Sequence, residues 1–253
     1  MITEHSKQPM ERVAIDIIGP MITSSRGNKY ILTIMEYFTK FAVAVTLSNI
    51  DANSVSNAFI NNYIHIFGVP SVLYTDQGAN VDGGLMKSVC ISLNIHETRT
   101  TIYHPQSDGL VERFNKALIN MISKYVVDEA EWDVLLQRLV FSYNIQRQES
   151  IKASPFLLMF GRHPRCSIDT QLRNDDDNVK ILEKSENFDL YNSALRKNEL
   201  ATKRQEKNYN RTSNNMVINK GDMIMVKQPY VNDRQGCKKL YKSWKGPFKV
   251  IES

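Results

Sequence analysis

One stretch, residues 100–120, constrains the fold of this chain more than any other: TTIYHPQSDGLVERFNKALIN. It has the pattern of a strand end, a polar loop and a helix, and Ser107 and Asp108 are residue types that commonly cap a helix start. The first turn carries an acid, Glu112, beside the loop. Apolar side chains then recur at helical spacing. We expect the buried face of this helix to consist of Leu110, Val111, Phe114, Leu118, Met121, Ile122 and Tyr125.

Two further acids occupy strand-like positions upstream of Glu112. Asp16 interrupts the apolar run RVAIDIIGP, and Asp76 directly follows the run SVLYT. A carboxylate within an apolar strand is costly unless it is paired or binds a metal. An acid at the carboxyl end of a strand points into the crevice where open α/β sheets bind ligands. We therefore predict that Asp16, Asp76 and Glu112 converge at one edge of a sheet.

Three converging carboxylates repel one another unless divalent cations bind between them. Hard oxygen ligands without a nearby His or Cys cluster favour Mg²⁺ or Mn²⁺ over zinc. Two such ions can activate a water and stabilise the leaving oxygen of an in-line phosphoryl displacement. Taken singly, each acid also has an ordinary structural explanation: Asp16 and Asp76 as turn residues, and Glu112 as an acid at a helix N-terminus.

The remaining apolar patterns predict an α/β sheet flanked by helices. We expect strands at residues 12–18, 30–35, 41–46, 72–74 and 95–100. We expect helices at residues 52–67, 84–93 and 131–144, and a short one that Ser154 caps with Pro155 at its first position. The shared apolar face of the helix at 52–67 consists of Val55, Ala58, Phe59, Tyr63, Ile66 and Phe67.

The last fifth of the chain differs from the rest in charge. Residues 204–253 carry eleven Lys and Arg against four Asp and Glu, a net charge of +7, and the remainder is near neutral at −2. A basic end suits a polyanion such as nucleic acid, although a solvated basic tail is a common alternative. We predict an N-terminal extension at 1–10, a core at 11–168, a partly helical linker at 169–215 and a small β module at 216–253.

Membrane and secreted classes are not indicated. The sequence contains no run of about 18 apolar residues, so we predict no transmembrane helix, and residues 1–12 lack the apolar core of a signal peptide. Three widely spaced cysteines, Cys90, Cys166 and Cys237, are typical of a reducing compartment.

The motifs together resemble those of a known family, the integrases of gypsy-type LTR retrotransposons, which are related to retroviral integrases and other DDE-type transposases. The resemblance rests on Asp16 in AIDIIGP, Asp76 in YTDQGAN, Glu112 in YHPQSDGLVERFN and the late motif GPFKV. The 35 residues between Asp76 and Glu112 match the spacing of the family's D,D(35)E pattern. Glu36, in MEYFTK, stands where the family often has Asp.

This resemblance implies specific expectations about fold and partners. It implies an RNase H-like core and a C-terminal SH3-like β-barrel, and with the chain end at Ser253 both a complete and a truncated barrel stay open. It implies two Mg²⁺ or Mn²⁺ ions on the acidic triad, double-stranded DNA as substrate and target, a homo-multimer, contact with chromatin and a nuclear location. No HxxxH and CxxC spacing is present, so we expect no zinc in this chain.

The same resemblance implies DNA contacts. Asn115 and Lys116 follow Glu112 by three and four residues and share its helix face. In similar integrases this spacing serves the DNA end, and the preceding loop, here with His104 and Gln106, touches DNA. An ordinary exposed lysine is an equal alternative for Lys116. In the C-terminal module we expect DNA contacts from Lys238, Lys239, Lys242 and Lys245.

Three functions remain open from the sequence. The first is an integrase that trims DNA ends and joins them to target DNA. The second is a domesticated or decayed derivative that binds DNA or chromatin without catalysis. The third is a plain RNase H-like nuclease, which the YHPQSDG loop and the GPF motif disfavour.

Overall fold

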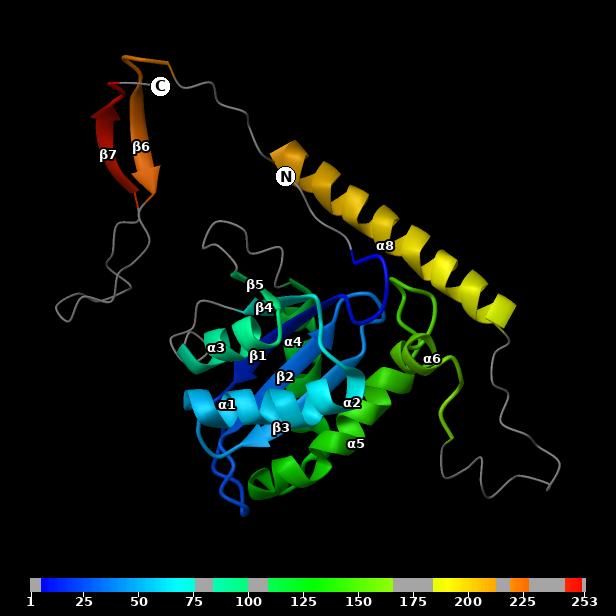
Figure 1. Cartoon of the computed structure of the whole chain (residues 1–253). Helices are drawn as coiled ribbons and strands as arrows, with labels where there is room; N and C mark the ends of the chain where they lie inside the picture. The colour runs from blue at the N-terminus through cyan, green and yellow to red at the C-terminus, as the bar shows by residue number, and fades with distance from the viewer. Residues whose placement is uncertain are drawn as a thin grey trace, which may run out of the picture. The chain divides into compact units, whose positions relative to one another are not determined.

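The structure, a computed structural model, describes residues 6–75, 84–99, 109–165, 184–212, 219–227 and 244–251. The chain divides into two units, Met1–Arg204 and Gln205–Ser253, and each is described by itself (Figure 1).

The first unit is built on a mixed sheet of five strands in the order β3-β2-β1-β4-β5 (Figure 1). The central strand β1 runs antiparallel to β2 and parallel to β4. The strands are β1 (Arg12–Ile18), β2 (Tyr30–Glu36), β3 (Ala42–Leu47), β4 (Val72–Thr75) and β5 (His96–Arg99). The helical segments are α1 (Ala52–Phe59), η1 (Ile60–Ile64), α2 (His65–Phe67), α3 (Gly84–Ser92), α4 (Gly109–Tyr125), η2 (Glu129–Glu131), α5 (Trp132–Ile145) and α6 (Pro155–Phe160).

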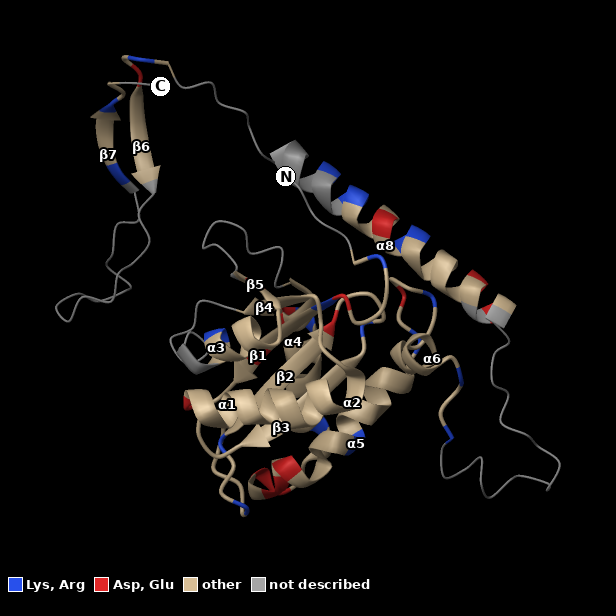
Figure 2. Cartoon of the chain, viewed as in Figure 1, with Lys and Arg blue, Asp and Glu red and all other residues tan. Residues whose placement is uncertain are grey.

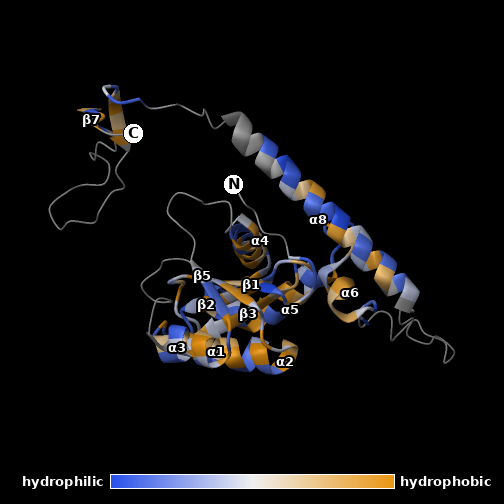
Figure 3. Ribbon diagram, turned by 45° about the horizontal axis from the view of Figure 1, so that its top comes forward, coloured by the Kyte–Doolittle hydropathy of each residue, from blue (hydrophilic) through white to orange (hydrophobic). Residues whose placement is uncertain are grey.

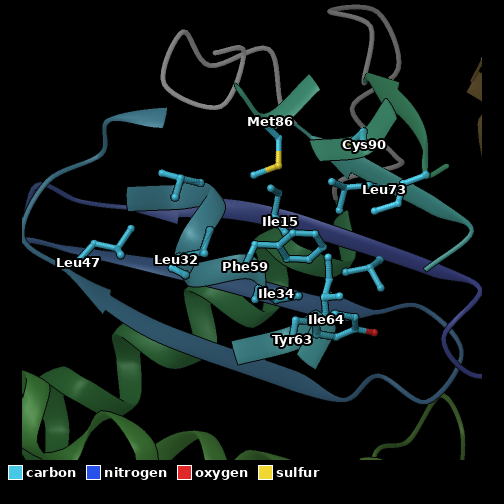
Figure 4. Close-up of a cluster of buried hydrophobic side chains, with 14 residues drawn as sticks. Ile15, Leu32, Ile34, Leu47, Phe59, Tyr63, Ile64, Leu73, Met86 and Cys90 are labelled. Atoms are coloured by element: carbon cyan, nitrogen blue, oxygen red, sulfur yellow. The ribbon is translucent and has the colours of Figure 1, made fainter. Parts of the chain in front are cut away.

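Alternating side chains of β1 serve two separate apolar layers. Val13 and Ile15 pack with α1, η1 and α3, and Figure 4 shows Phe59 and Tyr63 lying over Ile15 and Ile34 in this layer. Ala14 packs on the opposite face with α4 and α5. Figure 3 shows α4 on one side of the sheet and α1, α2 and α3 on the other. The sheet is thus covered on both faces, as the sequence pattern predicts.

The predicted helix at 52–67 contains one irregular turn, and this turn corrects its predicted face. Asp51 caps α1 through a hydrogen bond from the Ser54 N–H, but residues 60–64 form the π-helical turn η1. A π turn adds one residue to the repeat and therefore rotates everything after it. Ile64 is buried in consequence, whereas Ile66 is 64% exposed, so the prediction that Ile66 is buried is wrong.

Helix α4 has the predicted buried face except at its last residue. Val111, Phe114, Leu118 and Ile122 are buried against the sheet. Tyr125 is 64% exposed, contrary to the prediction, and Val126 packs on the layer in its place. The reason is the steady spacing of four residues from Phe114 to Ile122, which reaches residue 126 rather than 125.

Polar contacts hold the start of α5 to the connection between β1 and β2, and its end to the edge strand β3. At its start, the Asp133 carboxylate accepts hydrogen bonds from Ser24 Oγ and Asn28 Nδ2, both at 2.7 Å. Near its end, the Asn144 side chain pairs with the backbone of Ala42 in the edge strand β3: it accepts from the N–H at 2.9 Å and donates to the carbonyl at 2.8 Å. Side chains of α5 thus occupy backbone groups of the edge strand that would otherwise be unpaired.

The long helix α8 (Lys184–Thr212) packs on the first unit through residues before Arg204. Tyr191 donates to the Leu158 carbonyl at 3.0 Å, and Asn198 donates to the Phe38 carbonyl at 3.2 Å. Elsewhere α8 is strongly hydrophilic (Figure 3) and carries charges of both signs (Figure 2). A helix therefore lies within the predicted linker, while the linker bounds 169–215 stay a prediction.

In the second unit, the described residues form one antiparallel pair, β6 (Met223–Lys227) and β7 (Trp244–Lys249), with an irregularity between Ile224 and Val226. The predicted SH3-like barrel needs strands from residues outside the described ranges, so it stays a prediction. Among the described residues, no helix has the length and apolar character needed to cross a membrane.

Candidate active site

Asp16 lies on the face of the sheet that α4 covers. It follows Ala14 by two residues in β1, and Ala14 packs in the layer formed with α4 and α5. Its side chain is half-buried, whereas Val13, Ala14 and Ile15 before it are buried. The central strand therefore presents a single acid toward the start of α4.

Two N–H groups from different elements hold the Asp16 carboxylate. The backbone N–H of Ile17 donates to Oδ1 at 2.7 Å. The Nδ2 amide of Asn115 in α4 donates to Oδ2, also at 2.7 Å. The two hydrogen bonds fall on different oxygens, so both ends of the carboxylate are oriented.

Glu112 lies on the same side of α4 as Asn115, one turn earlier. The residues are three positions apart, which places them on one helix face, and Glu112 is exposed. Val111 and Phe114 alternate with them and are buried against the sheet, so the first turns of α4 are anchored. The Asn115 contact to Asp16 therefore brings the Glu112 turn to the β1 acid.

Asp76, the third predicted ligand, lies outside the described residues. The last residue of β4, Thr75, pairs with Ile15, and these are the chain neighbours of Asp76 and Asp16. Within the described ranges, which leave out Asp76, no three His, Cys, Asp or Glu residues come together as a metal site. The convergence of all three acids stays a prediction.

The available groups fit a hard divalent cation. Asp16 and Glu112 offer carboxylate oxygens, the ligand type that Mg²⁺ and Mn²⁺ prefer. The Asn115 Oδ1 atom is a buried acceptor without a hydrogen-bond partner. Neither cysteine nor histidine lies in the described part of β1 or α4, so the donor set does not suit zinc.

The predicted DNA-contact residues divide into described and undescribed sets. Lys116 and Lys245 are exposed, as a phosphate contact requires. Asn115 is half-buried and donates to Asp16, a role that the sequence interpretation missed. The spacing of three residues after Glu112 was the available signal. His104, Gln106, Lys238, Lys239 and Lys242 lie outside the described residues, and their roles stay predictions.

Glu36, which replaces a frequent Asp of the family, belongs to the core rather than to this site. Its buried carboxylate accepts the backbone N–H of Phe38 at 2.8 Å and that of Thr39 at 2.6 Å. Burial raises the pKa of Glu36, and these hydrogen bonds partly oppose the rise. Glu36 thus closes the turn between β2 and β3.

Sequence comparison finds integrase relatives along most of the chain, although no protein-family model matches it. It is 29% identical over 259 residues to the retrovirus-related Pol polyprotein from transposon 412 of Drosophila melanogaster, which covers 98% of this chain. It is 25% identical over 227 residues to the gypsy retrotransposon integrase-like protein 1 of Bos taurus, covering 88% of this chain. The chain spans 20% and 44% of the lengths of these two relatives.

Structural comparison finds the fold of retroviral integrases. The magnesium-bound catalytic core domain of HTLV-2 integrase, in its trimeric form, matches 60% of this chain and 97% of its own, with TM-score 0.50 and 17% identity. A chain from the structure of the simian T-cell lymphotropic virus intasome in complex with PP2A regulatory subunit B56 gamma matches 96% of this chain and 69% of its own, with TM-score 0.58 and 17% identity. The mixed five-stranded sheet with flanking helices thus has the predicted RNase H-like fold. Together with the sequence relatives, these matches confirm the resemblance that the motifs predict: the chain resembles the integrases of LTR retrotransposons and retroviruses.

Proposed function

We propose that this chain catalyses DNA integration: it trims the ends of element DNA and joins them to target DNA in a divalent-metal-dependent reaction. The observation that carries the proposal is the contact of Asn115 with Asp16, which brings the helix turn bearing Glu112 to the acid of the central strand. The parallel strand beside it, β4, leads directly into Asp76. Spacing and topology together support a site made of Asp16, Asp76 and Glu112.

Both steps are displacements at phosphorus. In the first, a water oxygen bonds to phosphorus and the bond between that phosphorus and the 3′-oxygen of the element DNA breaks. The departing nucleotides leave with the phosphate, and the 3′-oxygen takes a proton, so the element DNA keeps a free 3′-hydroxyl. In the second, this hydroxyl bonds to a target phosphorus, and the displaced target oxygen takes a proton. Mg²⁺ or Mn²⁺, in a pair of ions, would supply activation of the attacking oxygen and stabilisation of the leaving oxygen.

The protein's own part is to position these groups. Asp16 and Glu112 offer ligand oxygens from a strand and a helix that the apolar layer holds together. Lys116, four residues after Glu112 and exposed, is placed to attract a DNA phosphate. The basic residues of the second unit, of which Lys245 is exposed in the described part, support backbone contact with double-stranded DNA.

The proposal extends to partners and location. The simian T-cell lymphotropic virus structure is an intasome, and the HTLV-2 core is described in a trimeric form. By this likeness we propose that the chain acts as a homo-multimer on DNA, in the nucleus and in contact with chromatin. No zinc is required by the residues of the proposed site.

A strand-transfer assay tests the activity. Oligonucleotides that mimic the element ends are incubated with the full chain, target DNA and Mn²⁺, and joined products are measured. We expect wild type to yield joined product and Glu112→Gln to yield none, because the variant loses a ligand carboxylate. The matched control is Glu129→Gln, an exposed acid at another helix start, which should join normally.

The outcomes separate the three functions left open by the sequence. Joining by wild type and loss in Glu112→Gln support the integrase. DNA binding with no product from either protein indicates a non-catalytic derivative. Nicking without joining indicates a nuclease.

A further inference from the structure

Asn115 has a more specific role than a surface contact to DNA. We propose that it is a positioning residue whose amide orients the Asp16 carboxylate for a divalent cation, so that its loss weakens metal binding more than DNA binding. This inference rests on the proposed function, because it takes Asp16 as a metal ligand. The argument has three parts: the direction of the hydrogen bond, the place of Asn115 on α4, and its unpartnered oxygen.

The hydrogen bond fixes the orientation of the carboxylate. An ionised carboxylate only accepts hydrogen bonds, so the nitrogen of the Asn115 amide must face it. The Ile17 N–H holds Oδ1 and Asn115 Nδ2 holds Oδ2, each at 2.7 Å. Two donors on the two oxygens prevent the carboxylate from rotating. Partners of this kind, which orient a ligand without touching the metal, commonly contribute 10- to 100-fold to metal affinity.

Asn115 also connects the two elements that carry the proposed metal ligands, strand β1 and helix α4. Asp16 and Asn115 are 99 residues apart in sequence. Glu112 precedes Asn115 by three residues, so a bond from Asn115 to β1 sets how the Glu112 turn faces that strand. The buried neighbours Val111 and Phe114 fix the distance of α4 from the sheet, and the amide fixes its rotation.

The second amide atom shows that the network is incomplete. Asn115 Oδ1 is buried and has no hydrogen-bond partner. A buried acceptor without a donor costs about 1–3 kcal/mol, and a bound ligand or water is one explanation for such an atom in a native structure. A water or substrate hydroxyl entering beside Asp16 is the kind of donor that would satisfy this oxygen.

The test measures metal and DNA binding separately. Mn²⁺ binding to the full chain is titrated by the loss of the free-ion signal in electron paramagnetic resonance, and DNA binding is titrated in EDTA. The variants are Asn115→Leu, Asn115→Ala in case the leucine disturbs the helix contact, and Asp16→Asn as the reference for a lost ligand. The matched control is Asn120→Leu, an exposed asparagine on the same helix.

We expect both Asn115 variants to raise the Mn²⁺ dissociation constant about 10- to 100-fold and to leave DNA affinity within about twofold of wild type. Asn120→Leu should change neither. The joining rate of Asn115→Leu should recover toward wild type as Mn²⁺ is raised, because a positioning residue acts through metal occupancy.

Two results would overturn the inference, and they are distinguishable. If Asp16→Asn weakens Mn²⁺ binding but the Asn115 variants do not, the positioning role is wrong and the proposed function stands. If Asp16→Asn binds Mn²⁺ as wild type does, no metal site exists at Asp16, and the proposed function fails together with this inference.

Discussion

Helices α4 and α5 each have one asparagine that hydrogen-bonds to the sheet, and the two asparagines differ in how many of their amide atoms are bonded. Asn144 of α5 uses both amide atoms on the backbone of Ala42, at 2.9 and 2.8 Å, and is buried. Asn115 of α4 uses only its nitrogen, on the side chain of Asp16, and its oxygen is unpartnered. The first contact uses both amide atoms within the protein, whereas the second leaves a buried amide oxygen without a hydrogen-bond partner.

This difference separates a residue that holds the fold from one that serves a site. A fully satisfied buried amide contributes to stability, because its removal leaves the groups that it bonded buried without hydrogen-bond partners. A half-satisfied amide costs stability unless another group, such as a ligand or a water, completes its hydrogen bonds. The comparison predicts opposite consequences for the same substitution at the two positions.

The largest effect on stability should come from Asn144→Leu. The leucine side chain has the same branching and number of heavy atoms, but it leaves the N–H and the carbonyl of Ala42 without their hydrogen-bond partners. Each buried polar group left without a partner costs about 1–3 kcal/mol, so we expect the free energy of unfolding to fall by about 3 kcal/mol. Urea unfolding followed by circular dichroism measures it, with Asn120→Leu as the exposed control. A loss below about 1 kcal/mol would mean that water replaces the amide at the strand edge.

An intermediate effect, dependent on pH, should come from Asp133→Asn at the other end of α5. Burial alone would raise the pKa of the Asp133 carboxyl, but hydrogen bonds from Asn28 and Ser24, with nearby Arg26, outweigh burial and lower the pKa. A lowered folded-state pKa means that the ionised carboxylate stabilises the fold above its unfolded pKa of about 3.9. That contribution is lost as the pH falls through the folded-state pKa.

We therefore expect Asp133→Asn to lose about 1–2 kcal/mol at pH 7 and to converge toward wild type in increasingly acid solution below about pH 4. Urea unfolding at several pH values measures the difference. A difference that stays constant over this acid range would show that packing, rather than the charge of Asp133, holds the start of α5.

The sequence predicted those features that depend on local patterns. Strand β1 was predicted at its observed residues 12–18, because an apolar run that ends in Gly-Pro is defined by neighbours in sequence. The start of α4 near residue 109 follows from the cap residues and the apolar repeat. The extra residue in η1 carries no comparable local signal, so the burial of Ile66 was predicted wrongly.

Long-range contacts were the harder part. The contact of Asn198 with Phe38 joins residues 160 apart in sequence, and that of Asn115 with Asp16 joins residues 99 apart. Nothing near either residue in sequence specifies such a partner. The sequence therefore identified Asn115 by its spacing from Glu112 but assigned it to DNA, whereas the fold places its amide nitrogen on Asp16.

The smallest effect on stability should come from Asn115→Leu, measured without metal. The substitution removes one hydrogen bond to Asp16, but this half-buried carboxylate keeps the Ile17 N–H and can turn toward water. It also removes an unpartnered buried oxygen, which is a gain. The two changes offset each other, so we expect the free energy of unfolding to stay within about 1 kcal/mol of wild type, or to rise slightly. A loss as large as that of Asn144→Leu would show that both asparagines mainly stabilise the fold. The distinction between Asn144 as a structural residue and Asn115 as a residue of the site would then fail.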